Sequence, residues 1–418
     1  MADVLTLQDT VTGASFAPNE LEYFNPAVGQ VATLDVLYDY AQLRATLDRD
    51  ALPHSRDYTH WRYRDLMPLT ADNPLPNLAV GWTPLYDTPR LAADLGLGAA
   101  WVKDDGANPT GSLKDRASAM VVARALAKGI TTVSTASTGN AAAALAGMGA
   151  SIQHEPGVKI VIFVPATAPE AKIAQLLVYG ATVILVKASY DVAFDLCYET
   201  CIAQGWYCRN TGINPYTTEG KKTVAFEIAE QLNWNMPDAV IVSVGDGSII
   251  GGVHKGFWEL HQLGWIERIP RLIGVQAEGS STLVHAWENN IAGVDMTPQP
   301  ADTIADSISA GLPRDRVKAL RAVRETKGAF VAVSDEAILA AIPTFARLTG
   351  VFAEPSCAAI YAGAKRALEL GYLQRGERVA FISTGNGLKD IRRAQQSVSG
   401  GITVEPTLEA VRKALDTL

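Results

Sequence analysis

Short apolar runs alternate with amphipathic stretches through the middle of the chain, and this alternation constrains the fold more than any other feature. The runs are rich in β-branched residues, and they lie at Ala99–Lys103, Ile160–Pro165, Ala181–Lys187, Ala239–Val244, Leu272–Gln276 and Val379–Ser383. The stretches between them, such as 115–128 and 220–232, show helical periodicity. Strands that alternate with helices predict βαβ units and mostly parallel sheets, in which ligands bind at the carboxyl ends of the strands.

Length and charge narrow the class of protein further. A chain of 418 residues exceeds the size of one hydrophobic core, so two or three packed lobes are expected. The formal net charge is −8 and no basic stripe is present, which argues against a nucleic-acid partner. No apolar run is long enough to cross a bilayer, so we expect no membrane partner.

Cysteine usage and the start of the chain predict the compartment. The chain has 4 cysteines, none in a CxxC pair, and they are interpreted as small core residues of a cytoplasmic protein. The first basic residue is Arg44, which disfavours a secretory signal or a transit peptide. The 6 histidines show no metal-ligand spacing, so we predict no metal site.

Three loops rich in small polar residues follow strand-like runs, at 134–140 (STASTGN), 245–252 (GDGSIIGG) and 383–387 (STGNG). A glycine-rich turn from strand to helix lets backbone amides close on a phosphate. The 245–252 loop lacks the Lys-Ser/Thr ending of a P-loop and does not fit GxGxxG, so nucleotide binding by those routes is not expected.

Lys114 is the candidate reactive residue. It follows the turn in DDGANPTGSLKDR (104–116) and falls in the first turn of a predicted helix. The helix dipole disfavours a cation there and lowers its pKa, as a lysine that forms a Schiff base requires. The alternative is a solvated lysine after a turn. Asn140 likewise has an alternative as a simple N-cap residue.

Taken in order, several segments resemble the fold-type II pyridoxal phosphate (PLP) enzymes, and most closely the threonine synthases. They are GWTPL (81–85), NPTGSLKDR (108–116), STGN (137–140), NPYTTEGKKT (214–223), the glycine loop, EPSCAA (354–359) and STGNGLKD (383–390). The likeness spans most of residues 80–390. It implies two α/β lobes with PLP between them and a short ribbon-like lobe at the N-terminus. The expected ranges are 1–40 for that lobe, 41–104 and 216–418 for the large cofactor-binding lobe and 105–215 for the small lobe.

The resemblance also implies roles for single residues. Lys114 would carry the cofactor as a Schiff base and take the substrate's α-proton, Asn140 would bond the ring hydroxyl, and Thr384 would face the pyridine nitrogen. The cofactor phosphate would lie against Gly245, Asp246, Gly247, Ser248 and Ile249. Substrate contacts are expected from Ser112, Ser137, Thr138, Thr217, Lys222 and Arg314, of which Ser137 and Thr138 would bracket the carboxylate. Arg314 has the alternative of a surface ion pair.

The chain departs from the family pattern at two places. Thr217 stands where many threonine synthases have an arginine that helps to hold the substrate phosphate, and the loss removes a bidentate clamp. Lys222, with Lys221 as a second candidate, would compensate as a point charge. Some relatives begin with a zinc ribbon, whose four ligand positions correspond here to Asp9, Thr12, Asn25 and Val28. That set cannot make a structural zinc site, so a ribbon without metal is expected; the alternative is an unrelated N-terminal extension.

The implied reaction converts O-phospho-L-homoserine and water to L-threonine and phosphate, and the resemblance implies a homodimer with a small amino-acid substrate. One alternative is β-replacement or elimination on another activated amino acid, such as an O-phosphoserine-like substrate in a cysteate-synthase-like reaction. The departure at Thr217 favours that alternative. A second alternative is a non-catalytic amino-acid sensor, against which the presence of Lys114 argues.

Overall fold

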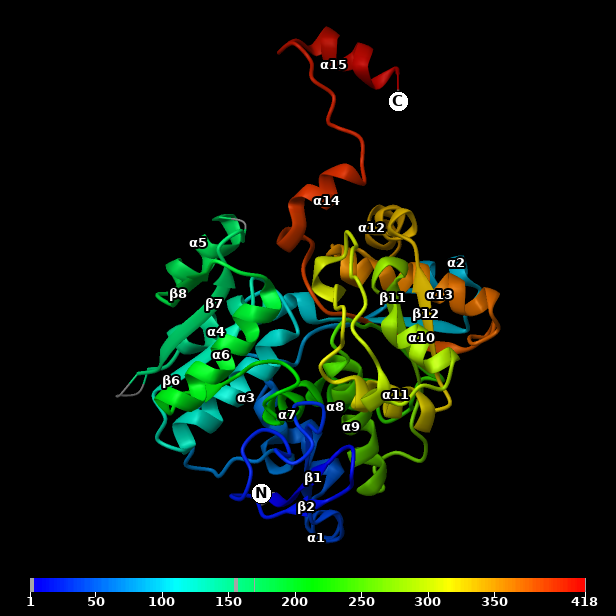
Figure 1. Cartoon of the computed structure of the whole chain (residues 1–418). Helices are drawn as coiled ribbons and strands as arrows, with labels where there is room; N and C mark the ends of the chain where they lie inside the picture. Colours follow the sequence, from blue (N-terminus) through cyan, green and yellow to red (C-terminus); the bar gives the residue numbers. More distant parts are fainter. Residues whose placement is uncertain (1–3, 154–156, 169, 418) are drawn as a thin grey trace.

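The computed structural model describes residues 4–153, 157–168 and 170–417. Within these residues the fold is built on three β-sheets (Figure 1). A six-stranded sheet is the centre of a large lobe, a four-stranded sheet is the centre of a small lobe, and a three-stranded sheet lies near the N-terminus. The predicted N-terminal lobe is therefore described from Val4 onward, and residues 154–156 and 169 of the predicted small lobe lie outside the described part.

The six-stranded sheet has the order β12-β11-β10-β13-β5-β4, and every neighbouring pair is parallel except β4 and β5. Its strands are β4 (Leu85–Asp87), β5 (Ala99–Asp104), β10 (Ala239–Ser243), β11 (Arg271–Ala277), β12 (Ala329–Val333) and β13 (Arg378–Ser383). Each residue of β10 is buried, as expected of a parallel strand with helices on both faces.

Helices cover both faces of this sheet (Figure 1). They are α2 (Pro89–Leu95), α8 (Thr223–Gln231), α9 (Ser248–Gln262), α10 (Thr282–Glu288), α11 (Arg316–Glu325), α12 (Asp335–Thr349) and α13 (Pro355–Glu369). Successive β10 residues point to opposite faces. Val240 and Val242 therefore join the core that includes α8, α9 and α11, whereas Ala239 and Ile241 join the core that includes α12 and α13.

The small lobe contains a parallel four-stranded sheet of order β8-β7-β6-β9. Its strands are β6 (Thr132–Ala136), β7 (Lys159–Pro165), β8 (Thr182–Val186) and β9 (Tyr207–Cys208), and its helices are α3 (Lys114–Ala127), α4 (Asn140–Ala150), α5 (Glu170–Val178) and α6 (Tyr190–Gln204). Helix α3 packs on α4 and also on α7 (Tyr216–Lys221), so it lies where the two lobes meet.

The predicted class, an α/β fold with mostly parallel sheets, is confirmed. Each predicted strand run corresponds to a strand of the six- or four-stranded sheet. The run Ala329–Val333 was not predicted and forms β12 at the sheet edge. The four-stranded sheet draws on residues 132–208 and the six-stranded sheet on 85–104 and 239–383, so the predicted lobe boundaries fall between the strands of the two sheets.

The N-terminal lobe is an antiparallel sheet of order β2-β1-β3, built from β1 (Val4–Asp9), β2 (Ser15–Phe16) and β3 (Leu34–Tyr38). The Asp9 carboxylate accepts hydrogen bonds from Thr12 Oγ1 and Asn25 Nδ2, each at 2.7 Å. Three of the four positions compared with a zinc ribbon thus meet in a hydrogen-bonded cluster, whereas Val28 is exposed. Descent from such a ribbon stays a prediction.

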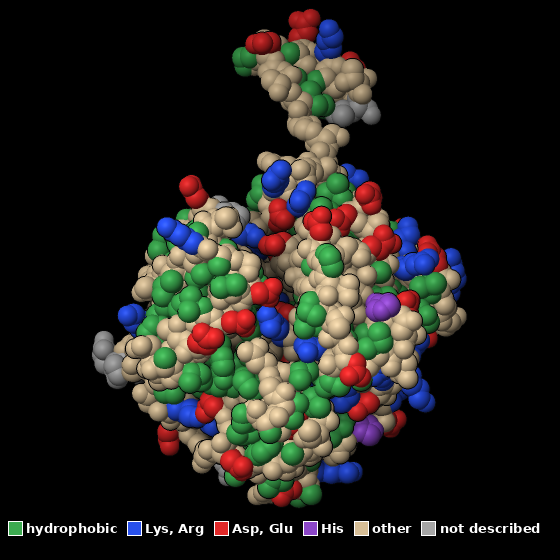
Figure 2. Space-filling model, in the orientation of Figure 1, with side chains coloured by type: hydrophobic (Ala, Val, Ile, Leu, Met, Phe, Trp, Pro, Cys, Tyr) green, Lys and Arg blue, Asp and Glu red, His purple; other side chains and the backbone are tan. Residues whose placement is uncertain are grey.

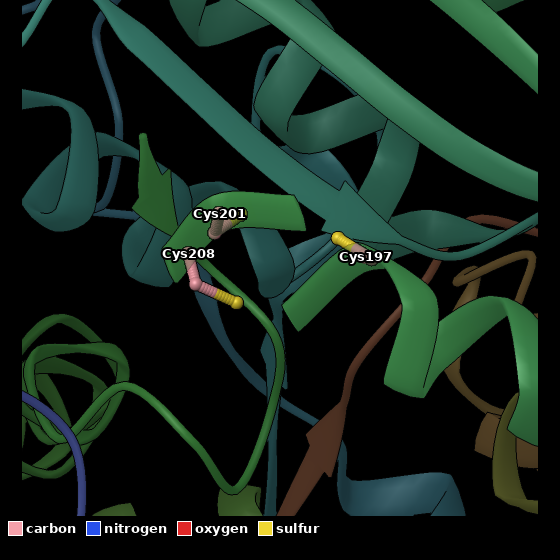
Figure 3. Close-up of side chains that lie close together, drawn as sticks. All are labelled: Cys197, Cys201 and Cys208. Carbon is pink, nitrogen blue, oxygen red and sulfur yellow. The ribbon is translucent and has the colours of Figure 1, made fainter. Parts of the chain in front are cut away.

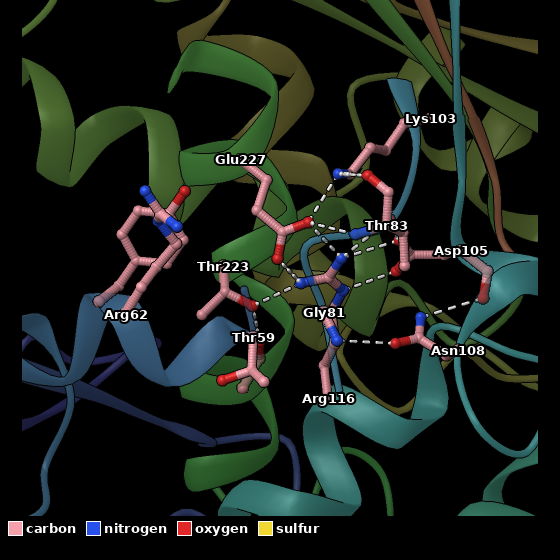
Figure 4. Close-up of polar contacts among 12 residues, drawn as sticks. Thr59, Arg62, Gly81, Thr83, Lys103, Asp105, Asn108, Arg116, Thr223 and Glu227 are labelled. Carbon is pink, nitrogen blue, oxygen red and sulfur yellow. Dashed lines mark hydrogen bonds and ion pairs between the residues drawn. The ribbon is translucent and has the colours of Figure 1, made fainter. Parts of the chain in front are cut away.

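Buried charges join α3 of the small lobe to the large lobe (Figure 4). Arg116 of α3 pairs with Asp105 at 2.6 Å and with Glu227 of α8. Lys103 of β5 also pairs with Glu227, at 2.6 Å. None of these side chains is exposed. Because each charge has an opposite partner, the cluster satisfies the usual condition for burying ionised groups.

The C-terminal segment leaves the body of the molecule after α14 (Ile391–Gln396), and α15 (Leu408–Leu415) stands apart from both lobes (Figures 1 and 2). Helix α1 (Tyr40–Thr46) follows the N-terminal sheet. Short 3-10 helices lie at Arg49–His54, His60–Leu66, Asp105–Ala107, Glu278–Ser280, Gly293–Asp295, Asp306–Ile308 and Gly387–Asp390. Among the residues described, no helix has the length and apolar character needed to span a membrane.

Candidate active site

A cavity of about 680 Å³ lies between the two lobes, and its walls come from the loops that follow the parallel strands. The wall includes residues 137–141, which follow β6 and reach into the first turn of α4, and residues 244–247, which follow β10. Thr384, directly after β13, also lines the cavity. The segment 306–312 and Lys114 also line it. This is the position predicted for a ligand site in parallel sheets.

Lys114 is the first residue of α3 and lines the cavity. Burial lowers the pKa of its amine below the ordinary lysine value; the Glu354 carboxylate opposes this shift and the Arg209 guanidinium adds to it. The turn that precedes α3 is fixed by Asp115, whose carboxylate accepts from Thr110 N at 2.7 Å and from the Thr110 hydroxyl. A rigid turn thus delivers an amine that deprotonates more easily than a solvated lysine.

Asn140 begins α4, and its side chain reaches across the cavity to the opposite lobe. Its Nδ2 donates to both carboxylate oxygens of Glu354 at 3.1 Å. Glu354 lies directly before α13 and also accepts from Ser356 Oγ at 2.7 Å. Glu354 is not among the site residues predicted from the sequence. Its signals there are the EPSCAA segment of the family resemblance and a Glu-Pro pair at the start of a helix, which the preference of the helix dipole explains equally well.

Thr384 presents its hydroxyl group to the cavity from the end of β13. Its Oγ1 and the Cys357 Sγ lie 3.0 Å apart in a hydrogen bond. Burial raises the pKa of the Cys357 thiol to about 12, and Glu354 adds to the shift. Cys357 therefore remains a neutral thiol that orients Thr384, and it is not a nucleophile.

The glycine loop after β10 forms a cradle at the N-terminus of α9. A Cβ at Gly245 would lie 2.8 Å from the Ile308 Cα, and Gly247 has a φ of +85°. Gly247 is also the N-cap of α9, which has no side-chain cap. The first-turn amides of this fifteen-residue helix are therefore available to an anion.

Asp246 lies in the same loop, yet its carboxylate is directed to the neighbouring segment. Its Oδ1 accepts from the Arg314 backbone N–H at 3.3 Å, and its carbonyl accepts from Asp315 N at 2.8 Å. Burial raises the pKa of Asp246. The side chain thus anchors the 314–315 segment to the loop and does not cap α9.

Lys221 is a fully buried cation on the cavity wall. Its Nζ donates to the hydroxyl of Ser248, the first residue of α9. No ion pair within the described ranges includes Lys221, although a buried lysine normally has a carboxylate partner. Burial lowers its pKa well below the ordinary value, and Arg209 lowers it further.

The structure corrects the predictions for Lys222 and Thr217. Lys222 is fully buried away from the cavity, where its Nζ pairs with Glu219 at 2.6 Å and Glu259 at 2.7 Å. Thr217 is also absent from the cavity wall, and its hydroxyl donates to the Asn214 carbonyl at 2.9 Å. Adjacent helical residues point in different directions, so Lys221 lies on the cavity side of α7 and Lys222 on the other side.

The other predicted substrate residues divide in the same way. Ser137, Thr138 and Arg314 line the cavity. Arg314 also pairs with the exposed Asp191 at 2.8 Å, so the ion pair considered as an alternative is present as well. Ser112 lies behind the wall, where its hydroxyl is buried with no hydrogen-bond partner in the described part of the chain.

Fold and site together define a class of protein. A lysine with a lowered pKa faces a glycine cradle at a helix N-terminus, and an unpaired ammonium group lies beside that cradle. Thr384 and Asn140 offer neutral hydrogen-bonding groups to the space between them. This arrangement fits a phosphorylated aldehyde cofactor held between two α/β lobes.

Comparison with known proteins agrees with this class. The chain belongs to the pyridoxal-phosphate dependent enzyme family, whose model matches residues 76–385. It is 38% identical over 386 residues to the threonine synthase of Methanocaldococcus jannaschii, and the aligned region covers 92% of this chain and 94% of that protein. It is also 38% identical to the threonine synthase of Methanosarcina acetivorans, over 91% of this chain and 92% of that protein.

Solved structures share the fold at lower identity. The processed form of threonine deaminase isoform 2 from Solanum lycopersicum has a TM-score of 0.65 at 22% identity, covering 92% of this chain and 98% of that one. Diaminopropionate ammonia lyase from Escherichia coli has a TM-score of 0.65 at 17% identity, covering 84% and 92%. The predicted fold type and the predicted cofactor, PLP, are confirmed, and the chain is a PLP-dependent lyase.

Proposed function

We propose that this enzyme is a threonine synthase, which converts O-phospho-L-homoserine and water to L-threonine and phosphate. The named relatives support this over more than nine-tenths of the chain. The observation that carries the proposal in the structure is the placement of cations. Besides Lys114, the lining residues include two basic side chains, Lys221 and Arg314, and the proposed pair of ligands brings two phosphate groups to one cavity.

We assign the cofactor phosphate to the cradle of Gly245, Asp246, Gly247, Ser248 and Ile249, with Lys221 as its charged partner. The contact between Lys221 and Ser248 supports this assignment, because it places the ammonium group at the start of α9. A phosphate would also supply the negative charge that Lys221 otherwise lacks. Asn140 would bond the ring hydroxyl group and Thr384 would face the ring nitrogen.

When bound, PLP supplies an aldehyde that condenses with amines and a ring that accepts electrons. Ser137 and Thr138, at the start of the loop before α4, would bind the substrate carboxylate. Arg314 would hold the substrate phosphate at the mouth of the cavity. Because the pKa of Lys114 is lowered, a larger share of its amine is neutral near pH 7, and the neutral amine can accept the α-proton.

Phosphate release tests the proposal. The purified, PLP-loaded enzyme is given O-phospho-L-homoserine, and free phosphate and amino-acid products are measured; we expect equal amounts of phosphate and L-threonine. O-phospho-L-serine with sulfite, run in parallel, tests the β-replacement alternative. If the first substrate gives no phosphate while the cofactor absorption of the enzyme is intact, the threonine synthase assignment is wrong.

The assembly, compartment and lobe boundaries are proposals as well. We propose a homodimer in the cytoplasm, with an amino-acid substrate and no nucleic-acid or membrane partner, on the basis of the acidic charge and the family resemblance. We keep residues 105–215 as the small lobe. Light scattering on the enzyme as it elutes from a size-exclusion column measures its mass. A mass of one chain, 44.6 kDa, would contradict the dimer.

A further inference from the structure

Three cysteines converge in the small lobe (Figure 3). None of them lines the cavity. Cys197 and Cys201 lie one turn apart on the same face of α6, and Cys208 ends β9. Their sulfur atoms all lie within 4.8 Å of one another, and none of the three residues is exposed. In the sequence these cysteines are spaced too irregularly to indicate a site, so only the fold shows that they meet.

The separation of the sulfur atoms suits a shared cation. A tetrahedral zinc ion with metal–sulfur bonds of about 2.3 Å holds its sulfur ligands about 3.8 Å apart. Small rotations of the cysteine side chains would bring the sulfur atoms to that separation. Two of the three ligands are already held one turn apart by α6. The described residues contain no other group of three such ligand side chains.

Polar atoms next to the sulfur cluster add to the case. Ser134 of β6 is fully buried, and its Oγ lies 3.3 Å from Cys197 Sγ. Asn210 Oδ1 accepts from the same sulfur at 3.7 Å. The serine oxygen can complete a tetrahedral set as the fourth ligand, and the asparagine can orient Cys197 from outside it.

Arg209 is a buried cation that follows the cluster in the sequence. It is fully buried, takes part in none of the ion pairs of the described residues, and leaves its Nη2 without a hydrogen-bond partner. It follows Cys208 directly in the sequence. Three thiolates and one divalent cation carry a net charge of −1, and Arg209 is a buried cation directly beside one of these cysteines in the sequence.

We propose that Cys197, Cys201 and Cys208, with Ser134 as the fourth ligand, bind a thiophilic divalent cation of the zinc class. The cation would replace the thiol protons, which pass to solvent. It would fasten α6 and β9 to β6, the strand that leads into the substrate-binding loop at 137–140. This site is independent of the reaction proposed above and would not touch the substrate.

Cadmium titration of the PLP-loaded enzyme tests the site, with thiolate-to-metal charge transfer in the ultraviolet as the readout. We expect saturation at one Cd²⁺ per chain, with competition by Zn²⁺ only in excess, because thiolates favour the softer cation. Cys201→Ser should weaken binding by more than the roughly 10- to 100-fold loss that follows removal of an outer-shell contact. Cys357→Ser, which changes the remaining cysteine, should retain the one-to-one titration.

A second measurement covers the case in which the cysteine variants fold poorly. The thermal midpoint of the unaltered enzyme is compared in Zn²⁺ and in EDTA, and bound zinc is counted by elemental analysis. A higher midpoint in zinc with one ion per chain supports the proposal. Absence of stoichiometric binding by the unaltered enzyme overturns it and makes the cluster ordinary core packing, as does binding that persists in Cys201→Ser.

Discussion

Lys221 and Lys222 are neighbours in the sequence and both are fully buried, yet their surroundings are opposite. Lys222 lies in the scaffold between two carboxylates, Glu219 and Glu259. Although burial raises the pKa of Glu219, the ammonium groups of Lys222 and Lys255 bring it below the ordinary value. Lys221 lies on the cavity wall with a hydroxyl as its partner and with burial lowering its own pKa.

The difference separates structural charges from charges kept for a ligand. The scaffold clusters around Glu219 and Arg116 bury charge only in matched pairs, so removal of one member leaves its partner uncompensated. The cavity wall holds the partly buried Lys114 and the fully buried Lys221 without such pairs, and that arrangement is costly unless an anion arrives. A mutation should therefore affect mainly stability in the first region and mainly ligand binding in the second.

The largest effect is expected at Lys114, the clearest member of the cavity group. Lys114→Ala should lower kcat for phosphate release by at least about 10³-fold, because both the covalent anchor and the proton acceptor are lost. The free energy of unfolding of the apoprotein should stay the same or rise, since no ion pair is broken. Activity within tenfold of the unaltered enzyme would remove Lys114 from the mechanism.

Lys222→Met tests the scaffold side of the comparison. It should lower the free energy of unfolding by about 3–5 kcal/mol, because Glu219 and Glu259 then share one remaining lysine. Urea denaturation of the apoprotein measures the effect. Lys187→Met, which alters an exposed lysine, is the matched control and should change stability by less than about 0.5 kcal/mol. A small effect at Lys222 would mean that the pairs are dispensable to the scaffold.

These two lysines also show where inference from sequence stops. The alternating runs and the small polar loops were enough to predict the sheets. The motif likeness predicted Lys114, Asn140, Thr384 and the glycine loop as cofactor-binding residues, and all of them line the cavity. The sequence favoured Lys222 over Lys221 as the point charge for the substrate phosphate, because an amino-acid sequence does not show which side of a six-residue helix faces the cavity. That side is set by the packing of α7 between α3 and α9.

The same limit applies to contacts between distant segments. The pairing of Asn140 with Glu354 and the meeting of three cysteines depend on how separate βαβ units fold together. Local periodicity contains no information about such distances. In the N-terminal lobe, Asp9, Thr12 and Asn25 meet through short-range turns, although the sequence was used there only to predict that they cannot bind zinc.

Lys221→Met tests the cavity side. The dissociation constant for PLP should rise by about 10- to 100-fold, the equivalent of one charge-assisted hydrogen bond. Binding of pyridoxal, which lacks the phosphate, should change little. Equilibrium dialysis of both ligands provides the comparison. If PLP affinity is unchanged while KM for O-phospho-L-homoserine rises, Lys221 serves the substrate phosphate instead.

The pH dependence of apoprotein stability supplies a second reading of Lys221. Its folded pKa lies below that of the unfolded chain, so folding expels a proton between the two values. The unfolded state binds more protons in that window, and stability therefore rises as the pH approaches the ordinary lysine value near 10.4. Lys221→Met should reduce this rise and leave the part due to the other lysines with a lowered pKa, Lys103, Lys114 and Lys389, as urea denaturation across that range would show.

The smallest effect is expected at Arg314, which lies between the two extremes. It lines the cavity and also pairs with Asp191, whose side chain is 76% exposed. Exposed pairs contribute about 0–1 kcal/mol, so Arg314→Gln should scarcely alter the free energy of unfolding. If Arg314 holds the substrate phosphate, KM should rise by about tenfold with little change in kcat, as expected when binding is lost equally from the ground and transition states.

Asp191→Asn is the control, because it removes the ion pair and leaves the guanidinium group in place. A rise in KM for both variants would show that the ion pair positions Arg314. No rise for either would mean that Arg314 is only a surface ion-pair residue and that Lys221 binds the substrate phosphate.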